Sequence, residues 1–324
     1  MSRCLVVGGG SFIGSNIVRR LTEQGMEVHV LEERSSDLWR LHEFFYRIDV
    51  HRADFQDLDS LNSVIGGISP NLVFNTVDYG CRVHHNDIER IYDVNFTGTV
   101  NLLKACKKVG FECFITTGSS EEYGYRSGCI SEDMAPCPRT DYGVANVSAT
   151  TYCLREALTN DLPIYTVRPF CAFGDFESRS KLIGAIFAGM IRHVPVFLVS
   201  PEAARDFIHI DDLVDIYFYI ARCKPTEYHI FNGGTGVAMR VIDVVEEIQH
   251  IFKQKIDVHW DVCNQSSALN KSLRCADMSR VMKHLSWTSR RTFREGLIES
   301  FEWFSKNFHM YKDGGERELI MSRL

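Results

Sequence analysis

Two short segments of the chain carry side chains that could move protons. The first follows an apolar run that predicts a strand, and it contains two hydroxyls and a carboxylate, Ser119, Ser120 and Glu121. The second opens a predicted helix and contains Tyr142 and Asn146, which are four residues apart and therefore project from one helical face. We expect both segments to present these candidate catalytic groups to one ligand-binding edge.

Short apolar runs alternate with amphipathic segments through the first half of the chain. Strands are predicted near residues 3–7, 27–32, 46–51, 71–75, 111–117 and 163–168, and the longest helices near residues 87–109 and 140–159. This alternation predicts an α/β fold of the Rossmann type, a doubly wound parallel sheet with helices on both faces. Ligands bind such sheets at the carboxyl ends of the strands.

A glycine-rich turn near the amino terminus follows the first predicted strand and precedes a helix. Its candidate cofactor-binding residues are Gly8, Ser11, Phe12, Ile13 and Gly14. Glycines let the backbone approach a pyrophosphate, whose charge is met by N–H groups at the start of the helix. An ordinary tight loop is the alternative, but the position between strand and helix favours a dinucleotide site.

An acid stands at the expected distance from this turn. Glu32 ends the second predicted strand, where a carboxylate accepts hydrogen bonds from ribose hydroxyls and repels a 2′-phosphate, so NAD is favoured over NADP. A solvated strand end is the alternative, and Arg34 keeps NADP open as a minority option. Farther along, Asp54 and Phe55 could hold the adenine, or could cap the helix that begins near Asp57.

The composition narrows the range of partners. With 45% apolar and 24% charged residues, the chain has the make-up of a globular protein, and its net charge of −6 argues against nucleic acid or an anionic membrane as the main partner. The chain opens on a strand without a basic and apolar leader, and no apolar run reaches membrane-spanning length. We therefore expect a cytoplasmic protein that binds neither nucleic acid nor a membrane.

The cysteines and histidines predict neither disulfides nor a metal site. None of the eleven cysteines forms a C-x-x-C pair. Those in apolar patterns predict small buried hydrophobes, namely Cys4, Cys106, Cys113 and Cys153. The one local histidine pair, His84 and His85, is adjacent in sequence, so its side chains should diverge, and we expect no metal.

Six short motifs resemble, in the same order, those of the extended short-chain dehydrogenase/reductase family, which contains NAD-dependent sugar-nucleotide epimerases, dehydratases and decarboxylases. They lie at residues 8–14 (GGxGFIG in the family), 95–103 (NVxGTxNLL), 168–174 (RPFNVYG), 205–212 (RDFxxVDD), 232–236 (NxGxG) and 285–287 (LGW). The resemblance implies a dinucleotide-binding domain over residues 1–174 and a smaller substrate-binding α/β lobe over 175–324. The segment near 205–222 is expected to pack back on the first domain.

The resemblance also implies roles for the polar residues. Ser119 would hydrogen-bond the sugar hydroxyl that is oxidised, Tyr142 would remove its proton while hydride passes to NAD, and Arg205 would contact the substrate diphosphate. Ser120 and Glu121 stand where dehydratases and decarboxylases of the family carry an acid/base pair. A carboxylate near a transient 4-ketone can take the acidic proton from the neighbouring carbon and so open an elimination. The alternative for Glu121 is a helix-start carboxylate that interacts with backbone N–H groups.

Three residues depart from the family pattern. Ser11 replaces the middle glycine of the turn, and Cys171 replaces an asparagine that contacts the nucleotide diphosphate. Asn146 replaces the lysine of Tyr-x-x-x-Lys, so it can still hydrogen-bond a ribose hydroxyl but brings no charge. A free tyrosine has a pKa of about 10, so roughly a thousandth is ionised at neutral pH, and each further unit costs about 1.4 kcal/mol. Slow or specialised turnover is therefore expected.

The leading expectation is an NAD-dependent enzyme that oxidises a nucleotide-diphosphosugar transiently at its 4-hydroxyl, with 4,6-dehydration favoured over epimerisation. Decarboxylation and an NADP-linked keto-sugar reduction remain open. A catalytically degenerate nucleotide-sugar-binding protein is the alternative from another class. The helices near 87–109 and 140–159 are those that the family uses to dimerise through a four-helix bundle, so a homodimer is expected.

Overall fold

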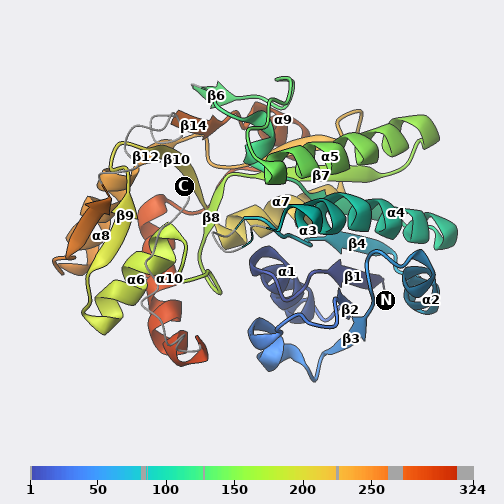
Figure 1. Ribbon diagram of the computed structural model, residues 1–324, viewed down its shortest axis with the longest axis horizontal. Coiled ribbons are helices and arrows are strands. Elements are labelled where there is room, and N and C mark those ends of the chain that lie inside the picture. Colours follow the sequence, from blue (N-terminus) through green and yellow to red (C-terminus); the bar gives the residue numbers. More distant parts are fainter. Residues whose placement is uncertain are drawn as a thin grey trace.

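Seven parallel strands form the central sheet of the computed structural model, which describes residues 2–81, 85, 87–126, 128–223, 226–261 and 273–311 (Figure 1). The strand order is β11-β7-β5-β4-β1-β2-β3. The bounds are β1 (Arg3–Val7), β2 (Glu27–Glu32), β3 (Ile48–Arg52), β4 (Leu72–Asn75), β5 (Cys113–Thr117), β7 (Ile164–Pro169) and β11 (Ile230–Gly233). The predicted doubly wound parallel sheet is therefore confirmed.

Both faces of this sheet are covered, because successive side chains of a strand point to opposite faces. In β1, Cys4 and Val6 belong to one core cluster, and Leu5 and Val7 belong to another. The first cluster includes residues of α1 (Phe12–Glu23), α7 (Ile210–Arg222) and α9 (Ser279–Leu285). The second includes residues of α2 (Leu58–Ile68), α4 (Gly98–Val109) and α5 (Asp141–Asn160). Burial on both faces explains why the central strands β1, β4 and β5 are largely apolar, whereas the edge strand β3 is mostly exposed and polar.

The helix predicted over residues 87–109 contains a local irregularity. It consists of α3 (Ile88–Tyr92), a π-helical turn η2 (Asp93–Thr97) and α4 without a break. Within the π turn, the Asn95 amide accepts from the N–H of Tyr79 at 3.1 Å and donates to the Tyr79 carbonyl at 2.5 Å. Such turns are frequent next to functional sites, and this one ties down the loop that follows β4.

The second lobe, at the left of Figure 1, is built around a smaller sheet and three helices. The sheet order is β12-β10-β14-β6, with β8 paired to β10, and β9 and β13 form a separate pair. The bounds are β6 (Cys129–Ile130), β8 (Cys171–Phe173), β9 (Val196–Val199), β10 (Ala204–His209), β12 (Ala238–Arg240), β13 (Val258–Asp261), β14 (Leu273–Ala276), α6 (Leu182–Arg192), α8 (Val241–Phe252) and α10 (Phe293–Asn307). Short 3-10 turns are η1 (Trp39–Phe44), η3 (Ser120–Tyr123) and η6 (Phe308–Met310). Phe187, Val244 and Leu297 belong to the core of this lobe.

The two lobes exchange segments. Strand β10 runs directly into α7, and α7 residues such as Leu213 and Tyr217 belong to the core cluster of the first sheet. Strand β11 then pairs with β7 at the edge of that sheet. The division at residue 174 stays a prediction. It does not account for β11, which comes after residue 174 but belongs to the first sheet.

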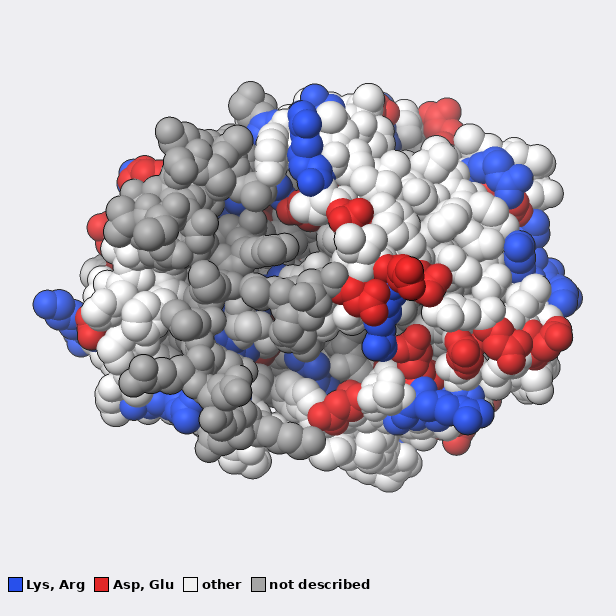
Figure 2. All heavy atoms as spheres, viewed as in Figure 1, with Lys and Arg blue, Asp and Glu red and all other residues white. Residues whose placement is uncertain are grey.

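Basic and acidic side chains are interspersed over the face shown in Figure 2. In the part of the chain that the structure describes, no helix has the length and apolarity that a bilayer crossing requires, and no three His, Cys, Asp or Glu side chains group as metal ligands. His84 lies outside the described residues. Cys4, Cys106, Cys113 and Cys153 are buried free thiols.

Candidate active site

The glycine turn is a close-packed cradle at the carboxyl end of β1. Gly8 adopts a φ of +75°, which favours glycine. A Cβ atom on Gly14 would lie 2.2 Å from the Gly8 carbonyl oxygen and 2.5 Å from Thr76 Oγ1, so only glycine fits there. Ser11 caps α1 by accepting from the Gly14 N–H at 3.1 Å. Phe12 opens the helix, so the N–H groups of its first turn begin at this edge, as a diphosphate requires.

Glu32 reaches the same turn from the end of β2. Its carboxylate accepts from the Gly10 N–H at 2.5 Å, and the residue is 5% exposed. Burial raises the pKa of Glu32, while the Gly10 N–H lowers it. The alternative of a solvated strand end is therefore wrong. The cradle and the buried acid fit a bound dinucleotide, and the contact of Glu32 with the adenosine ribose stays a prediction.

Two candidate adenine residues have different surroundings. Asp54 is exposed, and its carboxylate accepts from the Gln56 N–H at 2.9 Å. Phe55 is 3% exposed and belongs to the core between the sheet and α4. The contact of Asp54 and Phe55 with an adenine stays a prediction, and the Phe55 ring is buried in the core in this structure. The helix cap that was the alternative for this segment is Asp57, which accepts from two N–H groups of α2.

Tyr142 stands in the first turn of α5, against the loop that follows β4. A Cβ atom on Gly80 would lie 3.0 Å from Tyr142 Cδ2, so the ring packs directly on that loop. The pKa of Tyr142 is raised well above 10.0, first by desolvation and then by the charges of Asp78 and Cys81 and a side-chain hydrogen bond with Asp78. A side-chain hydrogen bond with Ser119 lowers it. A Cβ atom on Gly143 would lie 2.9 Å from the Glu121 carbonyl oxygen, so the start of α5 packs on η3, and Tyr142 and Ser119 lie on neighbouring elements at the carboxyl edge of the sheet.

Asn146 lies one helical turn beyond Tyr142. Its amide Nδ2 donates to the Tyr142 carbonyl at 2.9 Å, and the residue is buried. The side chain therefore folds back on its own helix, as short polar side chains do within helices. Its predicted contact with the nicotinamide ribose stays a prediction.

The adjacent glutamates of η3 have different tasks. Glu122 is fully buried, forms an ion pair with Arg168 at 2.7 Å, and accepts from the Ser119 N–H at 2.9 Å. Glu122 thus fills the helix-start role that was the alternative for Glu121. The Glu121 carboxylate is partly exposed and forms an ion pair with Arg274 of β14. Ser120, the first residue of η3, is partly exposed.

The predicted substrate-binding residues lie farther along this edge. Arg205 on β10 is 1% exposed, and its Nη1 donates to the Ala204 carbonyl at 2.8 Å. Desolvation lowers the pKa of Arg205, and Arg274 lowers it further, while Cys171 and Glu121 oppose them. Burial raises the pKa of Cys171. Two guanidinium groups therefore share one cluster with Cys171 and Glu121, and their contact with a diphosphate stays a prediction.

Sequence reasoning missed two charged residues of the site, Asp78 and Lys181. Asp78 follows β4 and interacts with the Tyr142 phenol. Lys181 immediately precedes α6, and its Nζ donates to the Cys81 carbonyl at 3.2 Å. The available signal was the position of Asp78 just beyond a strand's carboxyl end, whereas Lys181 reaches the site only through the packing of the two lobes.

Comparison with known proteins agrees with this geometry. The profile of the NAD dependent epimerase/dehydratase family matches residues 4–234. The chain is 25% identical to a UDP-glucuronate 4-epimerase of Thermodesulfobacterium geofontis, over 96% of this chain and 99% of that one. It is 22% identical to a dTDP-D-glucose 4,6-dehydratase of Mus musculus, over 96% and 91% of the two chains.

Solved structures of similar proteins have the same fold. The structure of MoeE5 in complex with UDP-glucuronic acid and NAD has a TM-score of 0.83 and 25% sequence identity, and covers 94% of this chain and 100% of that one. The family is NAD-dependent, and the cradle and buried acid described above fit that cofactor. The chain belongs to the NAD dependent epimerase/dehydratase family, as the order of its motifs predicted.

Proposed function

We propose that the protein oxidises a nucleotide-diphosphosugar transiently at its 4-hydroxyl and carries out a 4,6-dehydration. The observation that carries the proposal is the packing of the start of α5, which contains Tyr142, on η3, whose N-cap is Ser119 and which contains the partly exposed Glu121. A phenol and a hydroxyl on such neighbouring elements can bind an alcohol and take its proton. The buried cations Arg205 and Arg274 suit the negative charge of a nucleotide sugar.

Each residue has one task in this reaction. Ser119 orients the 4-hydroxyl, and Tyr142 takes its proton. When bound, NAD supplies the acceptor for the hydride of the same carbon. The resulting ketone acidifies the proton on C5, which Glu121 removes and passes to the C6 hydroxyl, so that this hydroxyl leaves as water. The hydride then returns to C6 and a proton to C5, so that no cofactor is consumed.

Epimerisation at C4 is the second candidate reaction, because relatives with that name match the chain as well as dehydratases do. The two are separated by incubating the protein with NAD and UDP-, dTDP-, GDP- and ADP-sugars in D₂O, followed by proton NMR. Dehydration gives a new C6 methyl signal and deuterium at C5, whereas epimerisation inverts C4 without deuterium. Carbon dioxide from a uronic acid would instead mark a decarboxylase.

Two variants make the experiment decisive. Tyr142→Phe should abolish conversion and keep cofactor binding, while Glu121→Gln should abolish only the elimination and still exchange the C4 hydrogen with the cofactor. If no sugar changes with the parent protein while it binds NAD and a nucleotide sugar, the enzymatic proposal fails.

A nucleotide-sugar-binding protein without turnover is the candidate from another class. It is favoured by Asn146, whose amide is bonded to its own helix where the family carries a lysine. Calorimetric binding of a nucleotide sugar without any product would support it. Preferential binding of NADPH in a titration would instead favour a keto-sugar reductase.

A homodimer in the cytoplasm belongs to the same proposal. The surfaces of α3 and α5 expose apolar side chains, among them Ile88, which is 55% exposed, and Leu158, which is 65% exposed. A second copy would cover such residues. Size-exclusion chromatography with light scattering measures the oligomeric state directly, and a monomeric mass would contradict this part of the proposal.

A further inference from the structure

Two thiols meet where β6 pairs with β14 (Figure 1). The Cys129 thiol donates to the Cys275 sulfur at 3.5 Å, although the two residues are 146 positions apart in the sequence. They are directly paired residues of neighbouring parallel strands. Such strands lie about 4.8 Å apart, and a disulfide joins Cα atoms that are roughly 4.4–6.8 Å apart. A bond between these sulfurs therefore needs no change in the pairing of the strands.

The backbone around the two thiols is held in place by further hydrogen bonds. On β6, the carbonyl of Ile130 accepts from the Asp277 N–H at 2.9 Å and from Asn232 Nδ2 at 2.8 Å. On β14, the Ala276 N–H donates to the buried carboxylate of Asp206 at 3.0 Å. The residue that follows each thiol is thus anchored, and this keeps the two sulfurs in contact.

The two thiols differ in their access to solvent. Cys129 is exposed, whereas Cys275 is buried and its thiol donates to the Ala276 carbonyl at 3.9 Å. Burial, followed by the hydrogen bond with Cys129, raises the pKa of the Cys275 thiol to about 12. Cys275 therefore stays protonated at neutral pH, and an oxidant from solvent meets Cys129 first. A buried second thiol at 3.5 Å can then react with the oxidised sulfur.

We propose that Cys129 and Cys275 form a site of reversible oxidation, at which a peroxide converts the two thiols into a disulfide between β6 and β14. The Cys129 sulfur loses its proton and attacks one peroxide oxygen, the O–O bond breaks, and a sulfenic acid and one water (or, from an alkyl peroxide, an alcohol) are formed. The Cys275 sulfur then attacks the Cys129 sulfur. The S–O bond breaks, an S–S bond forms, and the hydroxyl leaves with the Cys275 proton as water. The peroxide has taken two electrons, which a thiol reductant returns.

The disulfide would join two sides of the candidate site. Strand β6 belongs to the connection between η3 and α5, and Cys275 directly follows Arg274 on β14. Arg274 forms an ion pair with Glu121 of η3 and is paired with Arg205 of β10 in the sheet. The bond would therefore fix β14, and Arg274 with it, against the segment that connects the two candidate catalytic elements.

The first test identifies the bond by mass spectrometry. The reduced full chain is treated with hydrogen peroxide, its remaining thiols are alkylated, and the protein is digested. The expected product is a peptide pair that joins Cys129 to Cys275, lighter by two hydrogen atoms and separated again by dithiothreitol. A parent in which Cys275 stays free while Cys129 is oxidised further, or in which Cys129 joins another cysteine, would overturn the proposal.

Three variants test the order of the reaction. Cys275→Ser should leave Cys129 as a sulfenic acid that dimedone traps, and Cys129→Ser should leave Cys275 as a free thiol. Cys137→Ser is the matched control, because Cys137 is partly exposed and lies in the same connection between η3 and α5. It should form the disulfide at the parent's rate, and a loss of the bond in this control would contradict the assignment.

The second test measures stability. A bond between residues so far apart restricts the unfolded chain, so oxidation should raise the thermal midpoint of the parent by about 5 °C. Amide exchange at residues 275 and 276 should slow about tenfold. Neither change should occur in Cys129→Ser, whose exposed position makes the substitution mild. A lower midpoint after oxidation would show that the bond distorts the strands, and would overturn the inference.

Both tests use the protein without cofactor or sugar. A parent that converts no nucleotide sugar but forms the disulfide would overturn the proposed function alone. An active parent that forms no bond between Cys129 and Cys275 would overturn the inference alone.

Discussion

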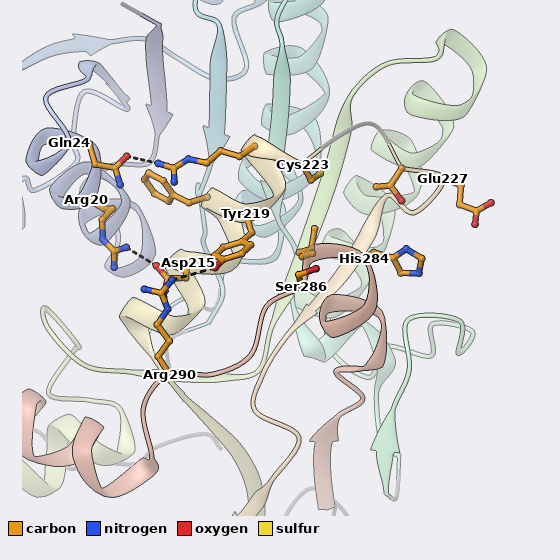
Figure 3. Close-up of a pocket in the computed structure, with 13 residues that line it drawn as sticks. Arg20, Gln24, Asp215, Tyr219, Cys223, Glu227, His284, Ser286 and Arg290 are labelled. Atoms are coloured by element: carbon orange, nitrogen blue, oxygen red, sulfur yellow. Dashed lines mark hydrogen bonds and ion pairs between the residues drawn. The ribbon is translucent and has the colours of Figure 1, made fainter.

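The two ends of α1 have different polar surroundings, and only the end at the glycine turn has the character of an active site. The hollow in Figure 3 has a volume of about 930 Å³ and lies where α1 and α7 end. Its arginines are engaged: Arg20 donates to Asp215 at 2.6 Å, and Arg222 donates to Gln24 at 2.9 Å. A hollow of this volume is large enough for a small ligand, although its charges are already matched.

At the carboxyl edge of the sheet the charges are arranged differently. Arg274 forms an ion pair with Glu121, yet its buried Nε and Nη2 have no hydrogen-bond partner among the residues that the structure describes. Within the described part of the chain, Lys181 donates to the Cys81 backbone carbonyl and not to a carboxylate. Buried polar atoms without partners are costly in a folded protein unless a ligand completes them. The unpaired nitrogens of Arg274, rather than the volume of a hollow, therefore mark the carboxyl edge of the sheet as the candidate site.

Helix direction gives a reason for this difference. Helix α1 begins at the glycine turn, where its partial positive charge suits a phosphate, and ends at the hollow with Arg20 in its last turn. Arg222 likewise stands in the last turn of α7. Cations at helix ends stabilise the fold, and the negative ends of both helices oppose a bound anion there. The arginines of the hollow are thus explained without a ligand.

Among the changes that test this comparison, the largest effect should come from the loss of the Ser119 hydroxyl. Ser119→Ala removes the group that orients the substrate, and kcat should fall about a hundredfold. Ser119 also accepts the Glu121 N–H at 3.1 Å, so Ser119→Thr, which keeps a hydroxyl and the cap, is the matched variant and should retain most of the rate. Steady-state kinetics with circular dichroism checks the comparison, and an equal loss in both variants would point to folding.

The second prediction concerns Glu177, whose titration should make the stability of the protein depend on pH. Burial raises the pKa of Glu177 from 4.5 to about 8, so the unfolded state releases this proton first and stability falls as pH rises from about 5 to 8. Glu177→Gln removes that loss and should stabilise the protein by about 4 kcal/mol at pH 8, and by less than about 1 kcal/mol at pH 5. Urea unfolding at both pH values measures this, and a gain that is equal at the two values would contradict it.

A smaller effect is expected for the cofactor acid. Glu32→Gln keeps an acceptor for the Gly10 N–H but loses the charge, so the Kd for NAD should rise about fivefold, the difference of about 1 kcal/mol between charged and neutral hydrogen bonds. The preference over NADP should narrow, because less charge repels the 2′-phosphate. Fluorescence titrations with both cofactors give the two constants. An unchanged ratio of the Kd values for NAD and NADP would mean that Glu32 does not face the adenosine ribose.

The smallest functional effect should come from the hollow of Figure 3. Asp215→Asn breaks the ion pairs with Arg20 and Arg290, at 2.6 and 3.5 Å. Because both arginines are partly exposed, the change should cost about 1 kcal/mol of stability and leave kcat and KM unaltered. A clear change in KM would show that the hollow of Figure 3 takes part in substrate binding, and would contradict its contrast with the carboxyl edge of the sheet.

Much of this architecture was predictable because it depends on short-range patterns. Strands buried on both faces must be apolar throughout, and a turn against Thr76 must carry glycine at position 14. The burial of Phe55 against α4 was not predictable, since it is set by tertiary packing. Lys181 was missed for the same reason: it is an ordinary charged residue before α6 until the packing of the two lobes brings its Nζ to the Cys81 carbonyl.

Strand β11 has a consequence for the order in which the chain can fold as it is made. The edge of the first sheet beside β7 is closed only by residues 230–233, and one of its faces is covered by α7. A ribosome must therefore release most of the second lobe before the nucleotide-binding half is complete. A fragment that ends at residue 174 would keep the glycine turn and Tyr142. It would leave β7 as an unpaired edge strand and expose the apolar face that α7 covers, and both features promote aggregation.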